Sequence, residues 1–323
     1  MLHREESPER LLYFALQKIG AIPIAALVTH RYAEISQFVH LSGAVACVYP
    51  EAAGDFRFAP VIERVQQENG TLRFRLVLGA AGPGEVSLAD LIDRPARLPK
   101  AELSKLRIDP TDPAIFQLSG GTTGIPKLIP RTHNDYAYNS RTAAPVVGVT
   151  RDSRVLIVIP IAHNLALACP GVQGYFLNGG TVVLHGNTRP TEMFALIAEH
   201  RITHLKVVPA LLVRLINAPE IGQYDLSSLK VIQSGGQRMQ PETRLRSKEL
   251  IPSVTVQENF GMGEGLLMFV RLDDPEDVRL ETCGRPVCPD DEVKLIDDEG
   301  ITHLNGAPTV LLMLASDPAA QAK

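Results

Sequence analysis

The stretch Phe116-Gln-Leu-Ser-Gly-Gly-Thr-Thr-Gly-Ile-Pro-Lys127 joins an apolar run to a loop that is rich in glycine and hydroxyl groups. Gly120, Gly121 and Gly124 have no Cβ, so backbone N–H groups can converge on an anion there. Further donors and one full positive charge come from Ser119, Thr122, Thr123 and Lys127. We therefore predict a phosphate-binding loop rather than a flexible linker, because Gly/Ser linkers rarely separate a buried strand from an amphipathic helix.

The residues around Lys127 distinguish this loop from the nucleotide loop of kinases and GTPases. In that loop, a Ser or Thr directly after the lysine holds magnesium. Here Pro126 precedes Lys127 and Leu128 follows it, so this hydroxyl is missing. The sequence therefore argues against a P-loop kinase or GTPase.

Length and composition are those of a globular chain. Its 323 residues are 45% hydrophobic, which is enough for a sizeable core. The net charge of −4 comes from interspersed charges without a basic stripe, so nucleic acid is not an expected partner. No apolar run approaches the roughly 20 residues that span a bilayer, and acidic groups stand where a signal peptide is basic and then apolar. We expect a cytoplasmic protein without a membrane partner, and its four cysteines should stay free thiols.

Alternating strand and helix patterns predict an α/β fold class. Apolar periodicity and turn residues predict helices over 11–19, 31–41, 57–68 and 88–92, and strands over 22–28, 44–49 and 72–78. A more regular series of strands follows at 114–118, 153–159, 180–184, 203–208, 229–233 and 254–259. We therefore predict two doubly wound, mostly parallel sheet layers, with ligands at the carboxyl ends of the strands.

The spacing Ser-Gly-Gly-Thr-Thr-Gly-x-Pro-Lys, with Leu128-Ile-Pro-Arg-Thr-His-Asn-Asp-Tyr136 after it, resembles the signature of the adenylate-forming superfamily. The likeness is greatest to the aryl-acid AMP ligases of siderophore biosynthesis, and it covers residues 10–300. It implies an incomplete large domain, truncated at both ends, without the small C-terminal lid domain. We expect a partial first α/β subdomain at 1–106 and a second one, with the ATP and aryl-acid motifs, at 107–270. The start of a β subdomain would follow at 271–300, and 301–323 would form a tail unlike the family.

The resemblance assigns His163 and Asn164 to the floor of the acyl pocket. An Asn at this place in aryl-acid ligases contacts the carboxylate side and the ortho-hydroxyl of the substrate, whereas amino-acid-activating relatives have an Asp that pairs with an ammonium group. A neutral amide suits an acid without an amine, because an Asp would repel the substrate carboxylate. A helix N-cap at Asn164 is an alternative that is compatible with this role.

Cys169 and Leu267 resemble the selectivity positions of these ligases. We expect Cys169 one and a half helical turns beyond His163. Relatives that act on 2,3-dihydroxybenzoate tend to have Ser and Val here, and salicylate ligases tend to have Cys and Leu, as this chain does. An apolar pocket rejects an added hydroxyl by only about 10²-fold, so the discrimination should be limited. The alternative for Cys169 is an ordinary small buried thiol.

Gln233-Ser-Gly-Gly-Gln-Arg-Met239 and Glu258-Asn-Phe-Gly-Met-Gly-Glu264 resemble the adenine and nucleotide motifs of the family. The resemblance implies ATP and Mg²⁺ as cofactors, with Glu264 as the residue that holds the metal. A solvated carboxylate is the plain alternative for Glu264. The ATP contacts predicted in the two motifs are Gly235, Gly236, Glu258, Asn259, Phe260 and Gly261.

The resemblance implies ATP-dependent activation of an aryl acid to aryl-AMP and pyrophosphate, with salicylate favoured over 2,3-dihydroxybenzoate. The acyl group would then pass to the phosphopantetheine thiol of an aryl carrier protein. Lys127, Glu264 and His163 are the predicted catalytic residues. The alternatives are a carboxylate–CoA ligase for another acid, and a non-catalytic remnant that at most binds nucleotide or acid.

The remaining polar residues near these motifs are interpreted as structural. His133 and Arg131 lie beside the loop, and His204 lies in an expected strand. No His/Cys/Glu cluster with metal-ligand spacing occurs in the sequence, and neither does a Ser-His-Asp set.

Overall fold

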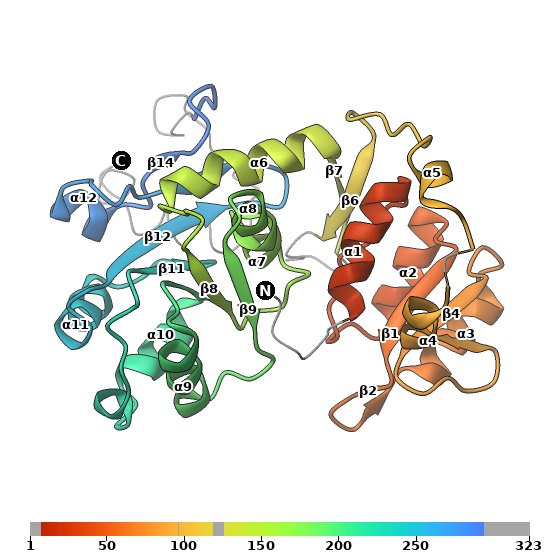
Figure 1. Cartoon of the computed structure of the whole chain (residues 1–323), viewed down its shortest axis with the longest axis horizontal. Helices are drawn as coiled ribbons and strands as arrows, with labels where there is room; N and C mark the ends of the chain where they lie inside the picture. Colours follow the sequence, from red (N-terminus) through yellow and green to blue (C-terminus); the bar gives the residue numbers. More distant parts are fainter. Residues whose placement is uncertain (1–7, 96, 119–125, 294–323) are drawn as a thin grey trace, which may run out of the picture. The chain divides into compact units, whose positions relative to one another are not determined.

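The computed structural model describes residues 8–95, 97–118 and 126–293. The chain divides into two compact units between Asn134 and Asp135. Each unit has its own parallel sheet, drawn in orange in the first unit and in green to blue in the second (Figure 1). These sheets and their helices confirm the predicted α/β class.

The first unit is centred on a three-stranded parallel sheet in the order β1–β4–β5. Its strands are β1 (Ala46–Pro50), β4 (Phe74–Leu78) and β5 (Glu85–Ser87), beside the short pair β2 (Ala52–Ala53) and β3 (Phe56–Arg57). Its helices are α1 (Pro8–Ile19), α2 (Tyr32–Ser42), α3 (Ala59–Glu68), α4 (Leu88–Asp93) and α5 (Lys100–Leu103). Ile62 and Val65 of α3 are fully buried in one apolar cluster with Tyr49 and Val77 of the sheet.

An antiparallel pair, β6 (Pro113–Leu118) and β7 (Leu128–Thr132), also belongs to this unit. β6 therefore lies outside the second parallel layer, in which the sequence had suggested it. The strand expected over 22–28 is also wrong, because only a single bridge joins Ile24 to Phe116. Pro23 has no N–H, so it can accept from the Phe116 N–H but cannot donate to a continuous ladder.

A seven-stranded sheet forms the second unit, in the order β14–β13–β12–β11–β10–β8–β9. The five strands from β12 to β9 are parallel, and β13 and β14 add to one edge in antiparallel fashion. The strands are β8 (Arg154–Ile157), β9 (Thr181–Leu184), β10 (His204–Val207), β11 (Val231–Gly235), β12 (Thr255–Gly261), β13 (Leu267–Phe269) and β14 (Arg285–Pro286).

Helices connect these strands, as a doubly wound sheet requires. They are α6 (His133–Val146), α7 (Asn164–Ala168), α8 (Gly171–Leu177), α9 (Pro190–His200), α10 (Pro209–Ile216), α11 (Pro241–Leu250), α12 (Glu276–Glu281) and the 3₁₀ turn η1 (Ile221–Gln223). The expected strands of this unit all exist. The largest shift is in β11, which begins two residues after the expected start at 229.

The two faces of the seven-stranded sheet differ in polarity. Side chains alternate along a strand, so Leu205 and Val207 of β10 join the apolar core with α9 and α10, while Lys206 points to the opposite face. Register places Lys206 beside Gln233 of β11, and Gln233 beside Gln257 of β12. We call Lys206, Gln233 and Gln257 the polar row. Gln257 Nε2 donates to the Val146 carbonyl at the end of α6, which places α6 over this face.

The sequence suggested a boundary near residue 107, whereas the compact units meet at residues 134–135. Lys127 and β6–β7 consequently go with the first unit. The division into functional subdomains at 107–270 and 271–300 stays a prediction, and the expected tail at 301–323 lies outside the described residues.

Candidate active site

Most of the predicted site residues gather at one edge of the seven-stranded sheet. β8, β10, β11 and β12 run parallel, so their carboxyl ends share that edge. His163 and Asn164 follow β8, Gly235 ends β11, and Phe260 and Gly261 end β12. This edge is where doubly wound sheets bind ligands.

The glycine-rich loop belongs to the first unit, and the structure describes only part of it. Ser119, Gly120, Gly121, Thr122, Thr123 and Gly124 lie outside the described residues. Lys127 is exposed and directly precedes β7. The roles predicted for all seven residues stay predictions.

His163 is the N-cap of α7, which corrects the expectation of a cap at Asn164. Its backbone is extended, with φ −75° and ψ 136°, and its Nδ1 accepts the Leu165 N–H at 3.2 Å. Burial lowers the pKa of His163, so the ring is neutral at pH 7. A neutral imidazole that accepts at Nδ1 carries its proton at Nε2. His163 is therefore a hydrogen-bond donor at this edge.

Asn164 is the first residue of α7 and is only 8% exposed. The Tyr136 hydroxyl of α6 donates to Asn164 Oδ1 at 2.8 Å. This bond occupies the acceptor end of the amide, and among the described residues no acceptor meets its Nδ2. Tyr136 thus orients Asn164 so that an N–H₂ donor is offered, which suits a ligand carboxylate or hydroxyl.

Cys169 lies beyond α7 instead of on it. The helix ends at Ala168, and Cys169 is its C-cap with φ −115° and ψ 68°, so His163 and Cys169 stand at the two ends of α7. A cis peptide bond joins Cys169 to Pro170. Asn139 of α6 holds the turn, because its Nδ2 donates to the Ala168 carbonyl at 2.8 Å and lies 3.8 Å from Cys169 Sγ. The thiol is therefore fixed and buried.

Gly235 and Gly236 are needed for two different reasons. A Cβ on Gly235 would lie 2.1 Å from Asn259 Oδ1, so only glycine lets the two strand ends approach. Gly236 has φ +89° and open space where its Cβ would be. Asn259 Oδ1 is buried without a hydrogen-bond partner, and Phe260 is half-buried. The nucleotide contacts predicted for these strand ends stay predictions.

Glu258 is held inside the second unit. Its carboxylate forms a buried ion pair with Arg244 of α11 and accepts the Met239 N–H at 3.2 Å. Burial raises the pKa of Glu258, and the neighbouring Arg244 guanidinium counteracts that effect. Both carboxylate oxygens thus have protein partners, so a direct ATP contact through this carboxylate stays a prediction.

Glu264 stands on the exposed turn between β12 and β13. Among the described residues no group of three metal-binding side chains occurs, so any cation there would have few protein ligands. A single carboxylate fits Mg²⁺, which keeps several waters and binds phosphate oxygens. Leu267, at the start of β13, is buried.

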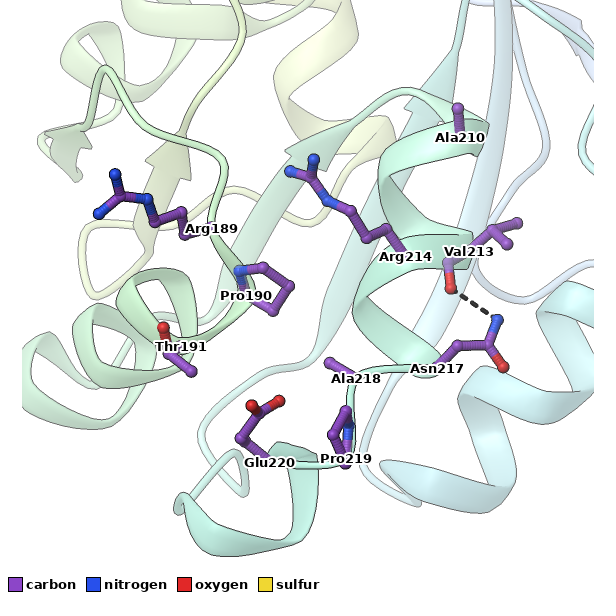
Figure 2. Close-up of a pocket in the computed structure, with 10 residues that line it drawn as sticks. All are labelled: Arg189, Pro190, Thr191, Ala210, Val213, Arg214, Asn217, Ala218, Pro219 and Glu220. Atoms are coloured by element: carbon purple, nitrogen blue, oxygen red, sulfur yellow. Dashed lines mark hydrogen bonds between the residues drawn. The ribbon is translucent and has the colours of Figure 1, made fainter.

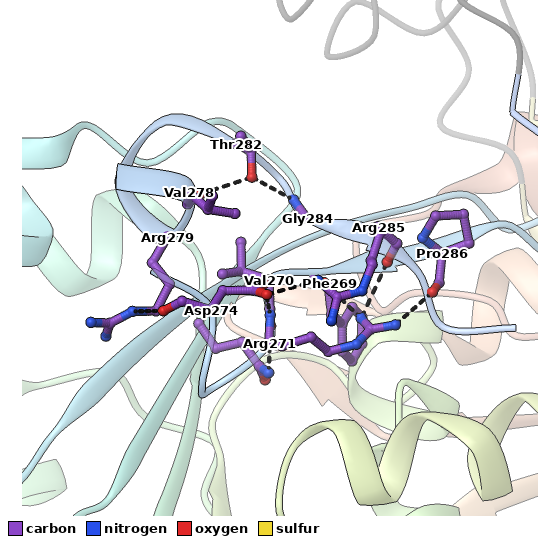
Figure 3. Close-up of polar contacts among 11 residues, drawn as sticks. Phe269, Val270, Arg271, Asp274, Val278, Arg279, Thr282, Gly284, Arg285 and Pro286 are labelled. Atoms are coloured by element: carbon purple, nitrogen blue, oxygen red, sulfur yellow. Dashed lines mark hydrogen bonds and ion pairs between the residues drawn. The ribbon is translucent and has the colours of Figure 1, made fainter. Parts of the chain in front are cut away.

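The segment around Arg271 fixes the edge strands that carry Leu267. Arg271 donates to the carbonyls of Phe269 at 2.7 Å, Arg285 at 3.2 Å and Pro286 at 2.6 Å (Figure 3). Asp274 accepts the Arg271 N–H at 2.6 Å and pairs with Arg285 at 2.7 Å. These contacts bind β13 to β14, a structural role to which the sequence gave no clue.

Three other residues near the site were missed by the sequence reading: Tyr136, Asn139 and Lys206. Tyr136 and Asn139 are spaced i, i+3 on α6, and this spacing could have indicated one buried polar face. Lys206 is fully buried in β10. His204 is structural as interpreted, since its Nε2 donates to the Val147 carbonyl at 3.3 Å and burial lowers its pKa to about 4.

A surface hollow of about 650 Å³ lies elsewhere, between the start of α9 and the end of α10 (Figure 2). Its lining includes Arg189, Arg214 and Glu220 but none of the predicted site residues. Arg189 already pairs with Glu192 at 3.0 Å. Within the described ranges, no helix is long and apolar enough to cross a membrane.

Comparison with known proteins shows which family the chain matches. A family model described as "AMP-binding enzyme" matches residues 6–301. The chain is 39% identical to a 2,3-dihydroxybenzoate-AMP ligase of Bacillus subtilis, over 88% of this chain and 51% of the ligase. It is 38% identical to a salicyl-AMP ligase / salicyl-S-ArCP synthetase of Mycobacterium tuberculosis, over 89% and 50%.

The chain is also similar to a solved structure. The apo structure of MbtA from Mycobacterium smegmatis matches with a TM-score of 0.82 and 34% identity, over 94% of this chain and 54% of that one. The chain thus spans about half the length of the curated relatives it matches.

Proposed function

The chain belongs to the AMP-binding enzyme family, and on that basis we propose that it takes part in the ATP-dependent activation of an aryl acid to aryl-AMP and pyrophosphate. The observation that carries the proposal is the orientation of Asn164. The Tyr136 hydroxyl binds Asn164 Oδ1, so a neutral amide donor is presented where an acid would bind. An amide neither repels a substrate carboxylate nor attracts an ammonium group.

The first step of this reaction needs no general base. A carboxylic acid with a pKa of about 4 is already ionised at pH 7, so catalysis consists of alignment and of neutralising phosphate charge. Asn164 Nδ2 and His163 Nε2–H would orient the carboxylate. Lys127 and the glycine-rich loop would bind phosphate, and Mg²⁺ held by Glu264 would supply further charge neutralisation.

Within this function, salicylate is favoured over 2,3-dihydroxybenzoate. Cys169 and Leu267 are both buried, which supports a close-fitting wall at the selectivity positions. A thiol is a weaker hydrogen-bond partner than a hydroxyl, so this wall disfavours the 3-hydroxyl of 2,3-dihydroxybenzoate. The acceptor is proposed to be the phosphopantetheine thiol of an aryl carrier protein, in siderophore biosynthesis. The name of the Mycobacterium tuberculosis relative, a salicyl-S-ArCP synthetase, supports that acceptor.

The experiment is a thermal-shift titration of the chain with a non-hydrolysable salicyl-adenylate mimic, beside its 2,3-dihydroxybenzoyl counterpart. A ligand at 100 times its Kd should stabilise the fold by about 2.7 kcal/mol. A rise in Tm that is larger for the salicyl compound is expected. A chain that melts cooperatively but ignores both mimics would contradict the proposed function.

A further inference from the structure

Lys206 is a buried amine that the proposed chemistry does not use. Its side chain is 0% exposed and lies in the polar row, on the sheet face opposite the apolar core. Its Nζ donates to the carbonyl of Cys169. Among the described residues no carboxylate lies within ion-pair distance of this amine. A lysine with three donors therefore has one protein acceptor, directly beside a predicted acid-binding residue.

Gln233 has a buried hydrogen-bond acceptor that lacks a donor. It is the register neighbour of Lys206 on β11, so the two side chains point to the same sheet face. Gln233 is 1% exposed, and its Nε2 donates to Gln257 Oε1 at 3.3 Å. Its own Oε1 is buried without any hydrogen-bond partner. Gln257 cannot serve it, since Gln257 Nε2 donates to the carbonyls of Val146 and Val270.

The polar row thus presents a donor and an orphan acceptor side by side. Burial lowers the pKa of Lys206 to about 7, but the amine can donate in either protonation state. Unpaired buried polar groups are costly, so a ligand that pairs both of them gains affinity. An apolar ring edge would pair neither, and a carboxylate would pair the amine but repel Gln233 Oε1. A hydroxyl accepts from Lys206 and donates to Gln233.

We propose that Lys206 Nζ and Gln233 Oε1 bind a hydroxyl on the ring of the acid, one that faces β10 and β11 rather than the Cys169 thiol. The inference rests on the proposed function and narrows its substrate class. The acid would be a salicylate-type aryl acid with a further hydroxyl at a ring position other than the one that Cys169 disfavours. Lys206 and Gln233 would then be specificity-determining residues.

The test measures Kd values for a panel of acyl-adenylate mimics with the wild-type chain. The panel contains the salicyl compound and the 2,3-, 2,4- and 2,5-dihydroxybenzoyl compounds. One isomer other than 2,3 should bind about 10-fold tighter than the salicyl compound, because a site with unpaired polar groups favours the ligand that pairs them. A wild-type chain that binds the salicyl compound as tightly as every isomer, or more tightly, would overturn the inference.

Two variants assign the preference to the polar row. Lys206→Met keeps the unbranched side chain up to its fourth heavy atom but removes the amine, and Gln233→Leu removes the orphan acceptor. Each should reduce the isomer-to-salicyl ratio about 10-fold while the Kd of the salicyl compound stays within about 3-fold. The control Lys230→Met, at an exposed lysine just before β11, should leave the ratio unchanged. An unchanged ratio in both test variants would also overturn the inference.

The outcomes separate the two proposals. If a folded wild-type chain binds no mimic at all, the proposed function fails. If it binds the salicyl compound and the polar-row variants do not change the preference, the proposed function stands and only the role of Lys206 and Gln233 is wrong.

Discussion

The seven-stranded sheet has two faces that are built for different purposes. On one face, Leu205 and Val207 pack with Phe194 of α9 and Leu212 of α10 in a continuous apolar core. On the other face, the polar row lies beneath α6 and the turn that follows α7, and it keeps one orphan acceptor. The first face supplies stability. The second lowers the stability because it buries unpaired polar groups, and these groups are the ones proposed to distinguish ligands.

The largest effect is expected on the apolar face. Phe194 is 2% exposed, so Phe194→Ala should lower the free energy of unfolding by about 4 kcal/mol through lost burial and a cavity. Denaturant titration measures this loss. The ratio of Kd values across the mimic panel should stay unchanged under conditions in which the variant is folded. Leu196→Ala, at a partly buried neighbour, is the control and should cost less.

If Phe194→Ala were tolerated within about 1 kcal/mol, the apolar face could not be the main source of stability. A changed ligand preference would show that the two faces are coupled.

The next effect has the opposite sign and belongs to the polar row. Lys206→Met should raise the free energy of unfolding by about 3 kcal/mol at pH 6. The pKa difference of about 3.4 units corresponds to nearly 5 kcal/mol at about 1.4 kcal/mol per unit, and losing the hydrogen bond to the Cys169 carbonyl offsets about 1.5 kcal/mol of it. Burial lowers the folded-state pKa of Lys206 to about 7, whereas an unfolded lysine has a pKa of about 10.4. The unfolded chain thus binds one more proton between these values, and wild-type stability rises with pH across that window.

The advantage of Lys206→Met should therefore be complete below about pH 7 and absent above about pH 10.4. Urea titrations at pH 6 and pH 9, with Lys230→Met as the exposed control, measure it. A variant that is less stable than wild type at pH 6 would refute the cost assigned to this buried amine.

A smaller effect is expected at the sheet edge. Gly235→Ala places a Cβ 2.1 Å from Asn259 Oδ1 and 2.9 Å from the Asn259 carbonyl oxygen, so β11 and β12 must separate there. We expect a loss of about 2 kcal/mol in stability and weaker binding of any adenylate mimic. Gly222→Ala, which meets nothing within 4 Å, is the matched control. Equal effects of the two substitutions would show that the strand ends need not approach.

The smallest effect concerns the orientation of Asn164. Tyr136→Phe removes the hydroxyl that donates to Asn164 Oδ1, so the free energy of unfolding should fall by about 1 kcal/mol. The affinity for the salicyl mimic should fall about 10-fold, because the amide loses its fixed direction. Calorimetric titration checks the affinity, and Tyr138→Phe, at an exposed hydroxyl on the same helix, is the control. Undiminished affinity would mean that Asn164 is oriented by other contacts.

Much of the fold could be predicted from the sequence because the parallel strands are nearly continuous apolar runs. Val155, Leu156 and Ile157 of β8 are all buried, and such runs between turn residues give a clear strand signal. The edge strands β13 and β14 were missed because they have only three and two residues, too few for a period to show. Their position depends on Arg271, whose partners are backbone carbonyls. Every residue has such a carbonyl, so the sequence does not indicate which ones Arg271 binds.

The candidate site was predictable where a residue type and its neighbours carry the information. Gly235 and Gly236 after an apolar strand indicated a close approach, and the structure gives its atomic reason in Asn259. The pairing of Tyr136 with Asn164 spans 28 positions and could not be read from either residue alone. Lys206 was missed because a lysine in a strand usually lies on a solvated face, and only register with Gln233 reveals its buried neighbourhood.

The strand order of the second unit also sets an order of assembly. From β11 to β14 each strand lies next to the one made just before it, whereas β10 joins β8 on the side away from β9. A chain that emerges residue by residue can therefore pair β8 with β9, add β10 to the free edge, and then lengthen the sheet in one direction only. Every later pairing joins chain neighbours, so the loops that must close remain short.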